Sequence, residues 1–336
     1  MPWKGEKDPY KIWLSEIILQ QTRVEQGLEY YNRFLTAFPG IHQLANAPET
    51  TVFKLWEGLG YYTRCKNLIA TAKYVSNDLK GKFPEVYEDI LTLKGVGPYT
   101  AAAIGSFAFN LPRAVVDGNV FRVLSRYFGI AIAIDSVEGK KLFTTLANEL
   151  LDKKKPAAYN QALMDFGATV CKPQQPLCSA CVLKNKCSAL NSGSVNQLPV
   201  KEKSITKKTR FFYYVVAEYK GEVYVRKWEP KDIWENLYEF ILIESNESLP
   251  IEKGKDWELL TAITGKAAVE IEHISATYKQ LLTHQVIYGR FIKIKLKKPL
   301  TIKGFEKADK EAMELLPFPK LITNYLKDKA VSLNLF

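Results

Sequence analysis

The stretch Leu93-Lys94-Gly95-Val96-Gly97-Pro98-Tyr99-Thr100 predicts a tight turn between two helices. Gly95 suits the end of the first helix, because glycine readily adopts the left-handed conformation that closes a helix. Pro98 suits the first turn of the next helix, where no backbone N–H is needed for a hydrogen bond. The backbone N–H groups at such a helix start are expected to form a binding site for a phosphate group, because Gly95 and Gly97 add no side-chain bulk around them.

A lone carboxylate, Asp117, follows two β-branched residues and is predicted to open another helix with Gly118-Asn119-Val120. An aspartate in this place is usually an N-cap, and a Gly-Val-Gly turn is usually only a turn. The combination resembles the helix-hairpin-helix, Gly/Pro-rich loop and aspartate of a DNA glycosylase superfamily. The resemblance implies that the hairpin holds a DNA backbone phosphate and that Asp117 acts on the sugar.

Composition sets the broad class of the protein. With 336 residues, of which 47% are hydrophobic, the chain is long enough for two domains with real cores. Its formal charge of +11 favours a polyanionic partner, although a solvated lysine-rich surface is the plainer alternative. We expect nucleic acid and no membrane, because no run approaches the roughly 18 apolar residues that span a bilayer.

The start of the chain, Met1-Pro2-Trp3-Lys4-Gly5, is polar and lacks the apolar core of a signal peptide. We therefore expect a cytoplasmic protein that is associated with the nucleoid through DNA binding. In a reducing compartment the five cysteines are expected to bind metal or to stay free.

The first helix is expected to open with Asp8 as N-cap and Pro9 as first helical residue. Glu16 lies at the edge of its apolar stripe. Gln20-Gln21 interrupts the stripe, and the Thr-x-x-Glu pattern of residues 22–25 predicts a capping box that starts a second helix. The two glutamines would lie at the tip between the helices, either solvated or probing DNA.

Helical hairpins are expected to continue through residues 40–93. Gly58-Leu59-Gly60-Tyr61-Tyr62 predicts a flexible turn with paired aromatic residues. Such tyrosines more often pack inside a protein, but a loop tyrosine can also wedge into a duplex. No segment before residue 200 alternates well enough to predict a strand, so residues 1–190 are predicted to form an all-α domain.

Four cysteines follow one another as Cys-x6-Cys-x2-Cys-x5-Cys, at Cys171, Cys178, Cys181 and Cys187. This clustering predicts a metal site. Zinc ribbons usually carry two Cys-x2-Cys knuckles and this run has one, so a compact cubane cluster fits better than zinc. The spacing resembles the cluster loop of endonuclease III and the adenine DNA glycosylases, which implies one 4Fe-4S cluster. The fifth cysteine, Cys65, is expected to be buried.

Residues 191–210 are rich in Ser, Asn and basic residues and are interpreted as a linker, whose cations could lie along DNA. Residues 211–336 are predicted to form an α+β domain. Strands are expected at 211–219, 222–228, 237–243, 273–281 and 286–296, and helices at 257–264 and 320–329. This domain resembles the nudix-like C-terminal domain of adenine DNA glycosylases, and it lacks an Arg-Glu-x-x-Glu-Glu helix, so no phosphohydrolase activity is expected.

Over almost its whole length the chain resembles the adenine DNA glycosylases, the MutY family, which remove adenine mispaired with 8-oxoguanine. The family segment Trp-Leu-Ser-Glu-x-x-Leu-Gln-Gln-Thr is matched by residues 13–22. The resemblance implies a role for each matched residue. These are Glu16 as general acid, Gln21 as DNA probe, Tyr61 as wedge, Gly95 and Gly97 in the hairpin, Asp117 with Asn119 as second carboxylate and support, and Gln161 at the flipped adenine.

The chemistry implied is acid-assisted hydrolysis of the N-glycosidic bond after the base is flipped out of the duplex. Glu16 would donate a proton to adenine N7, while the ionised Asp117 would face the oxocarbenium-like sugar. The main alternative is an oxidised-pyrimidine glycosylase and lyase like endonuclease III. Such enzymes carry a lysine nucleophile where this chain has Tyr99, so the resemblance favours a monofunctional enzyme in which Tyr99 positions the sugar or Asp117. A non-catalytic iron-sulfur DNA-binding protein is the second alternative.

The expected partner is double-stranded DNA with adenine opposite 8-oxoguanine or guanine, bound by a monomer. Three departures from the family pattern stand out. The chain starts close to the family's Leu-Pro-Trp motif, so the N-terminal helix that usually precedes this motif is expected to be absent, and a truncation or a missed start codon would expose apolar surface and lower stability. The family's Phe-Ser-His loop, which reads 8-oxoguanine, is replaced by Leu282-Thr283-His284, and Phe121 stands where some relatives have a lysine.

Overall fold

The computed structural model describes residues 4–202, 206–228, 232–251, 257–265 and 269–328. The chain divides into two compact units. The helical unit comprises Met1–Asn46 and Asn67–Ser204, and the sheet unit comprises Ala47–Lys66 and Ile205–Phe336. Pro2 and Trp3, with which the predicted family motif begins, lie outside the described residues.

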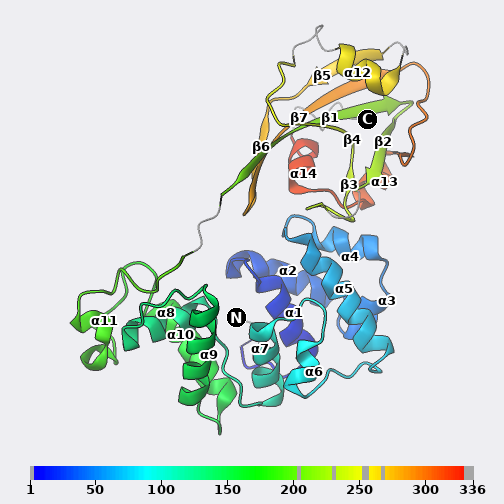
Figure 1. Cartoon of the computed structure of the whole chain (residues 1–336). Coiled ribbons are helices and arrows are strands. Elements are labelled where there is room, and N and C mark those ends of the chain that lie inside the picture. Colours follow the sequence, from blue (N-terminus) through cyan, green and yellow to red (C-terminus); the bar gives the residue numbers. More distant parts are fainter. Residues whose placement is uncertain (1–3, 203–205, 229–231, 252–256, 266–268, 329–336) are drawn as a thin grey trace. The chain divides into compact units, whose positions relative to one another are not determined.

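The helical unit contains no strand among its described residues, so the prediction of an all-α region before residue 200 is confirmed. Its helices are α1 (Pro9–Leu19), α2 (Val24–Ala37), α3 (Ile41–Asn46), α6 (Tyr87–Leu91), α7 (Pro98–Phe109), α8 (Gly118–Phe128), α9 (Val137–Leu150), α10 (Pro156–Thr169), the 3-10 turn η1 (Lys184–Lys186) and α11 (Ser188–Asn191) (Figure 1). Helix α5 (Tyr62–Asn77) starts in the sheet unit and continues into the helical unit. No helix in the described ranges is long and apolar enough to cross a bilayer.

Helix α1 begins as its sequence predicts. The Asp8 carboxylate accepts a hydrogen bond from the backbone N–H of Tyr10 at 2.9 Å, and Pro9 occupies the first helical position. The helix then buries Trp13, Leu14 and other large apolar side chains, each contributing about 1.5–3 kcal/mol to stability. It packs against α7, whose small residues let the two backbones approach closely. This contact brings the middle of α1 next to the start of α7.

The predicted capping box at the start of α2 is wrong. The N-cap of α2 is Arg23, which makes no side-chain capping hydrogen bond. The Thr22 hydroxyl instead donates to the carbonyl oxygen of Gln20 at 3.3 Å. Gln21 adopts a left-handed backbone conformation with φ of 55°. The left-handed Gln21 produces a tight turn that includes Thr22. Thr22 is therefore a turn residue and not the N-cap of α2.

The turn between α6 and α7 has the predicted form. Gly95 adopts a left-handed conformation with φ of 79°, and Pro98 is the first residue of α7. Helix α6 ends at Leu91, two residues earlier than expected, because the chain already turns at Thr92. The result is a helix-hairpin-helix whose second helix presents free backbone N–H groups at its start.

The sheet unit is built on two long parallel strands, β1 (Lys208–Tyr219) and β7 (Gln285–Leu296), paired from Lys208↔Gln285 to Glu218↔Lys295 (Figure 1). Around them lie β2 (Glu222–Lys227), β3 (Tyr238–Glu239), β4 (Ile241–Ser245), β5 (Val269–Ile274), β6 (Tyr278–Leu281) and β8 (Glu306–Ala308). The main path runs β3-β2-β1-β7-β5, with β4 on β1, β6 on β7 and β8 on β2. The helices are α4 (Glu49–Trp56), α12 (Trp257–Thr264), α13 (Lys310–Leu315) and α14 (Lys320–Leu326).

Two strands predicted as continuous are interrupted. The stretch 237–243 forms β3 and β4, separated at the buried Phe240. The stretch 273–281 forms β5 and β6, because Ser275 leaves the regular ladder and its hydroxyl accepts a hydrogen bond from the backbone N–H of Phe291 at 2.9 Å. Strand β8 and helix α13 were not predicted, since each is too short to show a clear period.

One side of the sheet is closed by stacked aromatic rings. The ring of Phe291 on β7 lies 5.1 Å from that of Tyr214 on β1 and 3.9 Å from that of Tyr325 on α14, nearly parallel to both. Such pairs add about 0.5–1.5 kcal/mol each beyond the area they bury. Helix α14 is thereby fixed on the sheet next to β6.

Candidate active site

A cavity of about 910 Å³ opens within the helical unit between α1, the turn after it, and the starts of α7 and α8. Helix α10 supplies another wall. The residues predicted from sequence that line this cavity are Glu16, Gln21, Tyr99, Asp117, Asn119 and Gln161. They come from four helices and one turn, so only the folded chain brings them together.

Glu16 is 9% exposed, although it is a carboxylic acid at the edge of an apolar stripe. Burial raises its pKa to about 7, because removing water disfavours the charged form. A hydrogen bond from the Tyr99 hydroxyl lowers the pKa, and the nearby Asp117 raises it again. Glu16 can therefore hold a proton near neutral pH, where an exposed glutamate would have lost it.

Tyr99 occupies the second position of α7, just after Pro98. Its hydroxyl donates a hydrogen bond to Glu16, and burial raises its pKa well above the usual 10. The group therefore remains a neutral phenol over the range in which Glu16 titrates. A phenol can orient a carboxyl group, but it cannot form a Schiff base with a sugar.

Asp117 is the N-cap of α8, as predicted. Its Oδ1 accepts hydrogen bonds from the backbone N–H groups of Asn119 at 2.9 Å and Val120 at 2.8 Å, and its Oδ2 accepts one from Asn119 Nδ2 at 2.7 Å. Burial raises the pKa of Asp117, and these three donors oppose that rise by favouring the carboxylate. Three N–H donors favour the ionised form, because hydrogen bonds to a charged carboxylate are stronger than those to a neutral acid.

Arg122 links this carboxylate to the cysteine-rich segment. Its Nη2 donates to Asn119 Oδ1 at 2.8 Å, and its Nε donates to the carbonyl oxygen of Cys171 at 2.7 Å. Nη2 also donates to the carbonyl oxygen of Gly167 on α10 at 2.8 Å. A Cβ at Gly167 would lie 2.7 Å from Asn119 Cβ, so only glycine allows this approach of α10 to α8. Asn119 is held from both sides.

The two hairpin glycines differ in what constrains them. At Gly95, φ is 79° and an added Cβ would lie 2.8 Å from Asn67 Cβ, so the fold itself requires glycine. At Gly97, φ is −95° and an added Cβ would meet nothing within 4 Å. Neither glycine lines the cavity with Glu16 and Asp117. The space beside Gly97 is open to a group outside the protein.

The cysteines predicted to bind a cluster gather around a second, smaller cavity of about 30 Å³. None of the four forms a disulfide bond. Arg126 Nη1 donates to Cys171 Sγ at 3.5 Å, and the backbone N–H of Leu183 donates to Cys181 Sγ at 3.4 Å. Within the described ranges no group of three or more His, Cys, Asp or Glu side chains is arranged to hold a single metal ion.

Tyr61, Thr283 and His284 belong to the sheet unit. Tyr61 is 43% exposed with a left-handed φ of 50°, and its hydroxyl is hydrogen-bonded to the hydroxyl of Thr283. Thr283 and His284 form the turn between β6 and β7, and the His284 carbonyl oxygen accepts from the backbone N–H of Lys208 at 2.9 Å. These residues are brought together within the sheet unit.

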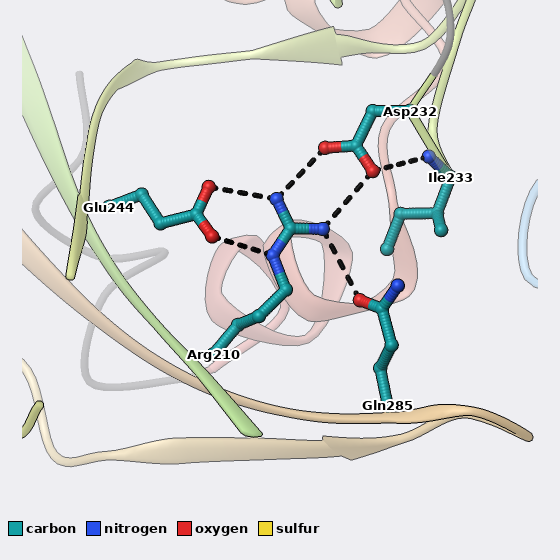
Figure 2. A network of polar contacts seen from close by, with 5 residues as sticks. All are labelled: Arg210, Asp232, Ile233, Glu244 and Gln285. Carbon is teal, nitrogen blue, oxygen red and sulfur yellow. Dashed lines mark hydrogen bonds and ion pairs between the residues drawn. The ribbon is translucent and has the colours of Figure 1, made fainter. Parts of the chain in front are cut away.

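A nearly buried arginine anchors the base of this turn (Figure 2). Arg210 on β1 donates to both oxygens of Glu244 at 2.7 and 2.8 Å and to both oxygens of Asp232 at 3.1 and 2.9 Å. It also donates to Oε1 of Gln285 at 3.2 Å, directly after His284. All five guanidinium hydrogens can be used in such a fork, which fixes the ends of β1, β4 and β7 to one another.

Sequence reasoning missed several charged residues of the cavity, among them Lys4 and Asp165. Lys4 Nζ donates to both carboxylate oxygens of Asp165 at 2.8 and 2.7 Å, and Gln161 Nε2 donates to Asp165 Oδ1 at 3.0 Å. The spacing of four between Gln161 and Asp165 was the available signal, because residues at i and i+4 share a helix face. Nothing local points to Lys4.

Comparison with known proteins places this geometry in context. The family model of the HhH-GPD superfamily of base excision DNA repair proteins matches residues 14–149. The adenine DNA glycosylase of Buchnera aphidicola subsp. Baizongia pistaciae is 38% identical over 242 residues, which cover 71% of this chain and 68% of that protein. The adenine DNA glycosylase of Mus musculus is 40% identical over 211 residues, covering 59% of this chain and 41% of that protein.

Among solved structures, a thermostable thymine-DNA glycosylase is similar with a TM-score of 0.53 and 33% sequence identity. The match covers 57% of this chain and 88% of that one. The cavity with Glu16 and Asp117 lies in the unit that carries most of the segment matched by the family model.

Proposed function

The chain belongs to the adenine DNA glycosylase family, and from that premise we propose that it hydrolyses the N-glycosidic bond of adenine opposite 8-oxoguanine or guanine in duplex DNA. It is a DNA N-glycosylase of base excision repair. The observation that carries the proposal is the presence of two carboxyl groups, Glu16 and Asp117, on the walls of one cavity, one able to keep its proton near pH 7 and the other held by three N–H donors.

The division of labour follows from these environments. A flipped adenine in the cavity would receive a proton at N7 from Glu16, which makes the base a better leaving group. Asp117 would stabilise the positive charge that develops on the sugar. A carboxylate about 4 Å from that charge gains roughly 4 kcal/mol at an effective dielectric near 20, on the order of a thousandfold in rate. General acid catalysis adds about a hundred- to ten-thousandfold.

Asn119 and Tyr99 serve as positioning residues in this scheme. Asn119 holds Asp117 Oδ2, and Tyr99 holds Glu16. Because Tyr99 stands where bifunctional relatives place a lysine, the enzyme is monofunctional and leaves the DNA strand uncut. Phe121 packs edge-on against Phe143 with ring centroids 5.4 Å apart, so that position supplies no amine either.

The four cysteines fit one 4Fe-4S cluster. They surround a common cavity and none of them forms a disulfide bond, and their sequence carries one Cys-x2-Cys knuckle where zinc ribbons usually carry two. A cluster would fix the fold of the segment after α10 through Cys171, Cys178, Cys181 and Cys187. Iron and sulfide analysis with a visible absorption spectrum tests this, and a protein that contains zinc alone would contradict it.

DNA binding is assigned to the hairpin and the net charge. The N–H groups at the start of α7, next to the open space at Gly97, would bind a backbone phosphate, while Gln21 at its exposed turn would probe the duplex. The partner is double-stranded DNA, bound by a monomer in the cytoplasm.

The sheet unit is assigned to recognition of 8-oxoguanine, with a nudix-like fold. Tyr61 would insert beside the oxidised base and the Thr283 hydroxyl would hydrogen-bond to it, with His284 next to it in the same turn. Leu282 cannot stack as the family's phenylalanine would. Replacing both Thr283 and His284 by alanine should therefore weaken the preference for 8-oxoguanine over guanine, and unchanged discrimination would remove this assignment.

The test of the function is a single-turnover excision assay on duplexes that contain adenine opposite 8-oxoguanine, adenine opposite guanine, thymine opposite guanine, or thymine glycol. Thymine opposite guanine is included because of the similarity to a thymine-DNA glycosylase. Adenine release is expected without strand cleavage and without a complex trapped by borohydride. Release of thymine glycol with a trapped complex would favour the endonuclease III-like alternative, and binding without release would favour a non-catalytic protein.

A further inference from the structure

The cavity contains a second pair of interacting side chains that the catalytic scheme does not use. Gln161 and Asp165 lie one turn apart on α10, and both line the cavity with Glu16 and Asp117. Gln161 Nε2 donates a hydrogen bond to Asp165 Oδ1 at 3.0 Å. The side-chain amide is therefore not free to turn within the cavity.

The chemistry of Asp165 decides which end of the amide it holds. An ionised carboxylate can only accept hydrogen bonds, so the NH₂ end of Gln161 must face it. Lys4 also requires Asp165 to be an acceptor. The Lys4 ammonium group can only donate, and it donates to both carboxylate oxygens of Asp165, at 2.8 and 2.7 Å. The amide orientation follows from the partners and does not depend on telling nitrogen from oxygen in the structure.

We propose that Asp165 fixes the polarity of the Gln161 amide and thereby makes the enzyme select a purine with an amino group, and reject one with an oxo group, at its 6-position. This inference rests on the proposed excision of adenine. With its nitrogen held by Asp165, Gln161 offers its carbonyl oxygen to a base in the cavity. The 6-amino group of adenine donates to that oxygen, whereas the 6-oxo group of hypoxanthine would bring two acceptors together.

The size of the effect follows from the cost of an unpaired acceptor. A site built to hydrogen-bond one substituent rejects its isostere strongly, because the buried polar group is left without a partner. One such contact is worth about tenfold or more in relative rate. Asp165 is a positioning residue in this scheme, since it acts on the base through Gln161.

A purely structural role is the competing explanation. The Lys4 and Asp165 side chains are 41% and 42% exposed, and such pairs usually contribute little to stability. In that case loss of Asp165 would slightly loosen the segment before α1 and would affect every substrate alike. The two explanations therefore differ in specificity and not in overall rate.

The experiment uses the full chain and three bases placed opposite 8-oxoguanine: adenine, hypoxanthine and unsubstituted purine. Purine has no 6-substituent, so its excision measures general damage to the enzyme. Single-turnover rates are compared for the wild type, Asp165→Asn and Asp165→Glu. The matched control is Glu29→Gln, which breaks the Arg33–Glu29 ion pair on α2, outside the cavity.

In Asp165→Asn the new amide can either accept from or donate to Gln161, so both orientations become available. We expect the adenine-to-hypoxanthine rate ratio, with each rate normalised to purine, to fall about tenfold. Asp165→Glu keeps an acceptor-only carboxylate and should retain most of the ratio, and Glu29→Gln should retain all of it.

Equal losses on all three bases in Asp165→Asn would overturn the inference and leave the proposed function intact, because the wild type would still release adenine. An unchanged ratio in a fully active Asp165→Asn enzyme would overturn it as well. A wild-type enzyme that releases no adenine would refute the proposed function, and the inference with it.

Discussion

The hydroxyl of Tyr99 donates a hydrogen bond to the carboxyl group of Glu16 and so connects the first turn of α7 to the middle of α1. Burial is the largest influence on Glu16 and raises its pKa to about 7, while this hydrogen bond lowers it. The tyrosine thus sets how far the pKa rises. An acid works best when its pKa is near the working pH, and burial together with this hydrogen bond gives Glu16 a pKa in that range.

Excision should slow as the pH rises through about 7, because only protonated Glu16 can donate to the base. In Tyr99→Phe the hydrogen bond that favours the charged form is lost, so the pKa of Glu16 rises and the decline moves to higher pH. Single-turnover rates between about pH 5.5 and 9 measure both curves. The control is Tyr74→Phe, at a tyrosine that is 43% exposed. A decline that stays in place in Tyr99→Phe would contradict the role given to the hydroxyl.

Glu16→Gln should lower adenine excision by about a hundred- to ten-thousandfold while DNA binding persists, because the amide cannot donate a proton. Excision at the wild-type rate would refute the acid assignment. Glu25→Gln, an exposed substitution at the start of α2, is the control.

The same variant should be more stable than the wild type at alkaline pH. The pKa of Glu16 is about 7 in the folded protein against a usual 4.5, so the folded state binds the proton more tightly. Stability therefore declines as the pH rises from about 4.5 to 7, and the wild type then carries a buried charge. At pH 8 Glu16→Gln should gain up to about 3 kcal/mol, and near pH 4.5 almost nothing. Chemical denaturation of both proteins at the two pH values measures the difference, and a gain that is independent of pH would contradict it.

The two hairpin glycines should respond differently to alanine. Gly95→Ala forces a left-handed residue against Asn67 and should lower the free energy of unfolding by about 1–3 kcal/mol. Gly97→Ala meets no atom of the protein and should leave stability within about 0.5 kcal/mol. If a phosphate lies at this turn, Gly97→Ala should nevertheless weaken DNA affinity. Denaturation and DNA titration of the same two proteins separate the effects, and full affinity in Gly97→Ala would place the phosphate elsewhere.

Replacing Arg122 by methionine should lower the free energy of unfolding by about 2–4 kcal/mol, because three backbone carbonyl groups and Asn119 lose a buried donor. Excision should fall further than binding, since Asn119 then holds Asp117 less firmly. Arg113→Met, which breaks an exposed pair with Glu88 and a contact with the Tyr87 ring, should cost no more than about 1 kcal/mol. Equal effects of the two substitutions would show that burial of Arg122 is unimportant.

The sequence predicts features that depend on the chemistry of neighbouring residues. Asp8 with Pro9, Pro98, and Asp117 each mark a helix start at the right place, because caps and turns are local events. Gly95 takes the expected left-handed conformation but does not end α6, which already stops at Leu91. The predicted capping box at Thr22 is wrong, and the cause is again local. The pattern of side chains was correct, but the left-handed backbone at Gln21 gives Thr22 a different task.

Features that depend on distant contacts were not visible in the sequence. Lys4 and Asp165 are 161 positions apart, and neither has a local signal that points to the other. The break between β5 and β6 depends on a hydrogen bond between Ser275 and the backbone of Phe291 on a third strand. The family resemblance implied a protonated Glu16, but the burial that raises its pKa depends on the folded structure and was not visible in the sequence.

Asp117 begins α8 and, in the proposed scheme, also faces the reacting sugar, and an asparagine caps a helix about as well as an aspartate. One base change in the codon, which replaces Asp117 by asparagine, would therefore abolish excision and leave the fold intact. Such a protein would still bind its mismatch but would not excise the base. The bound lesion would then be shielded from other repair enzymes.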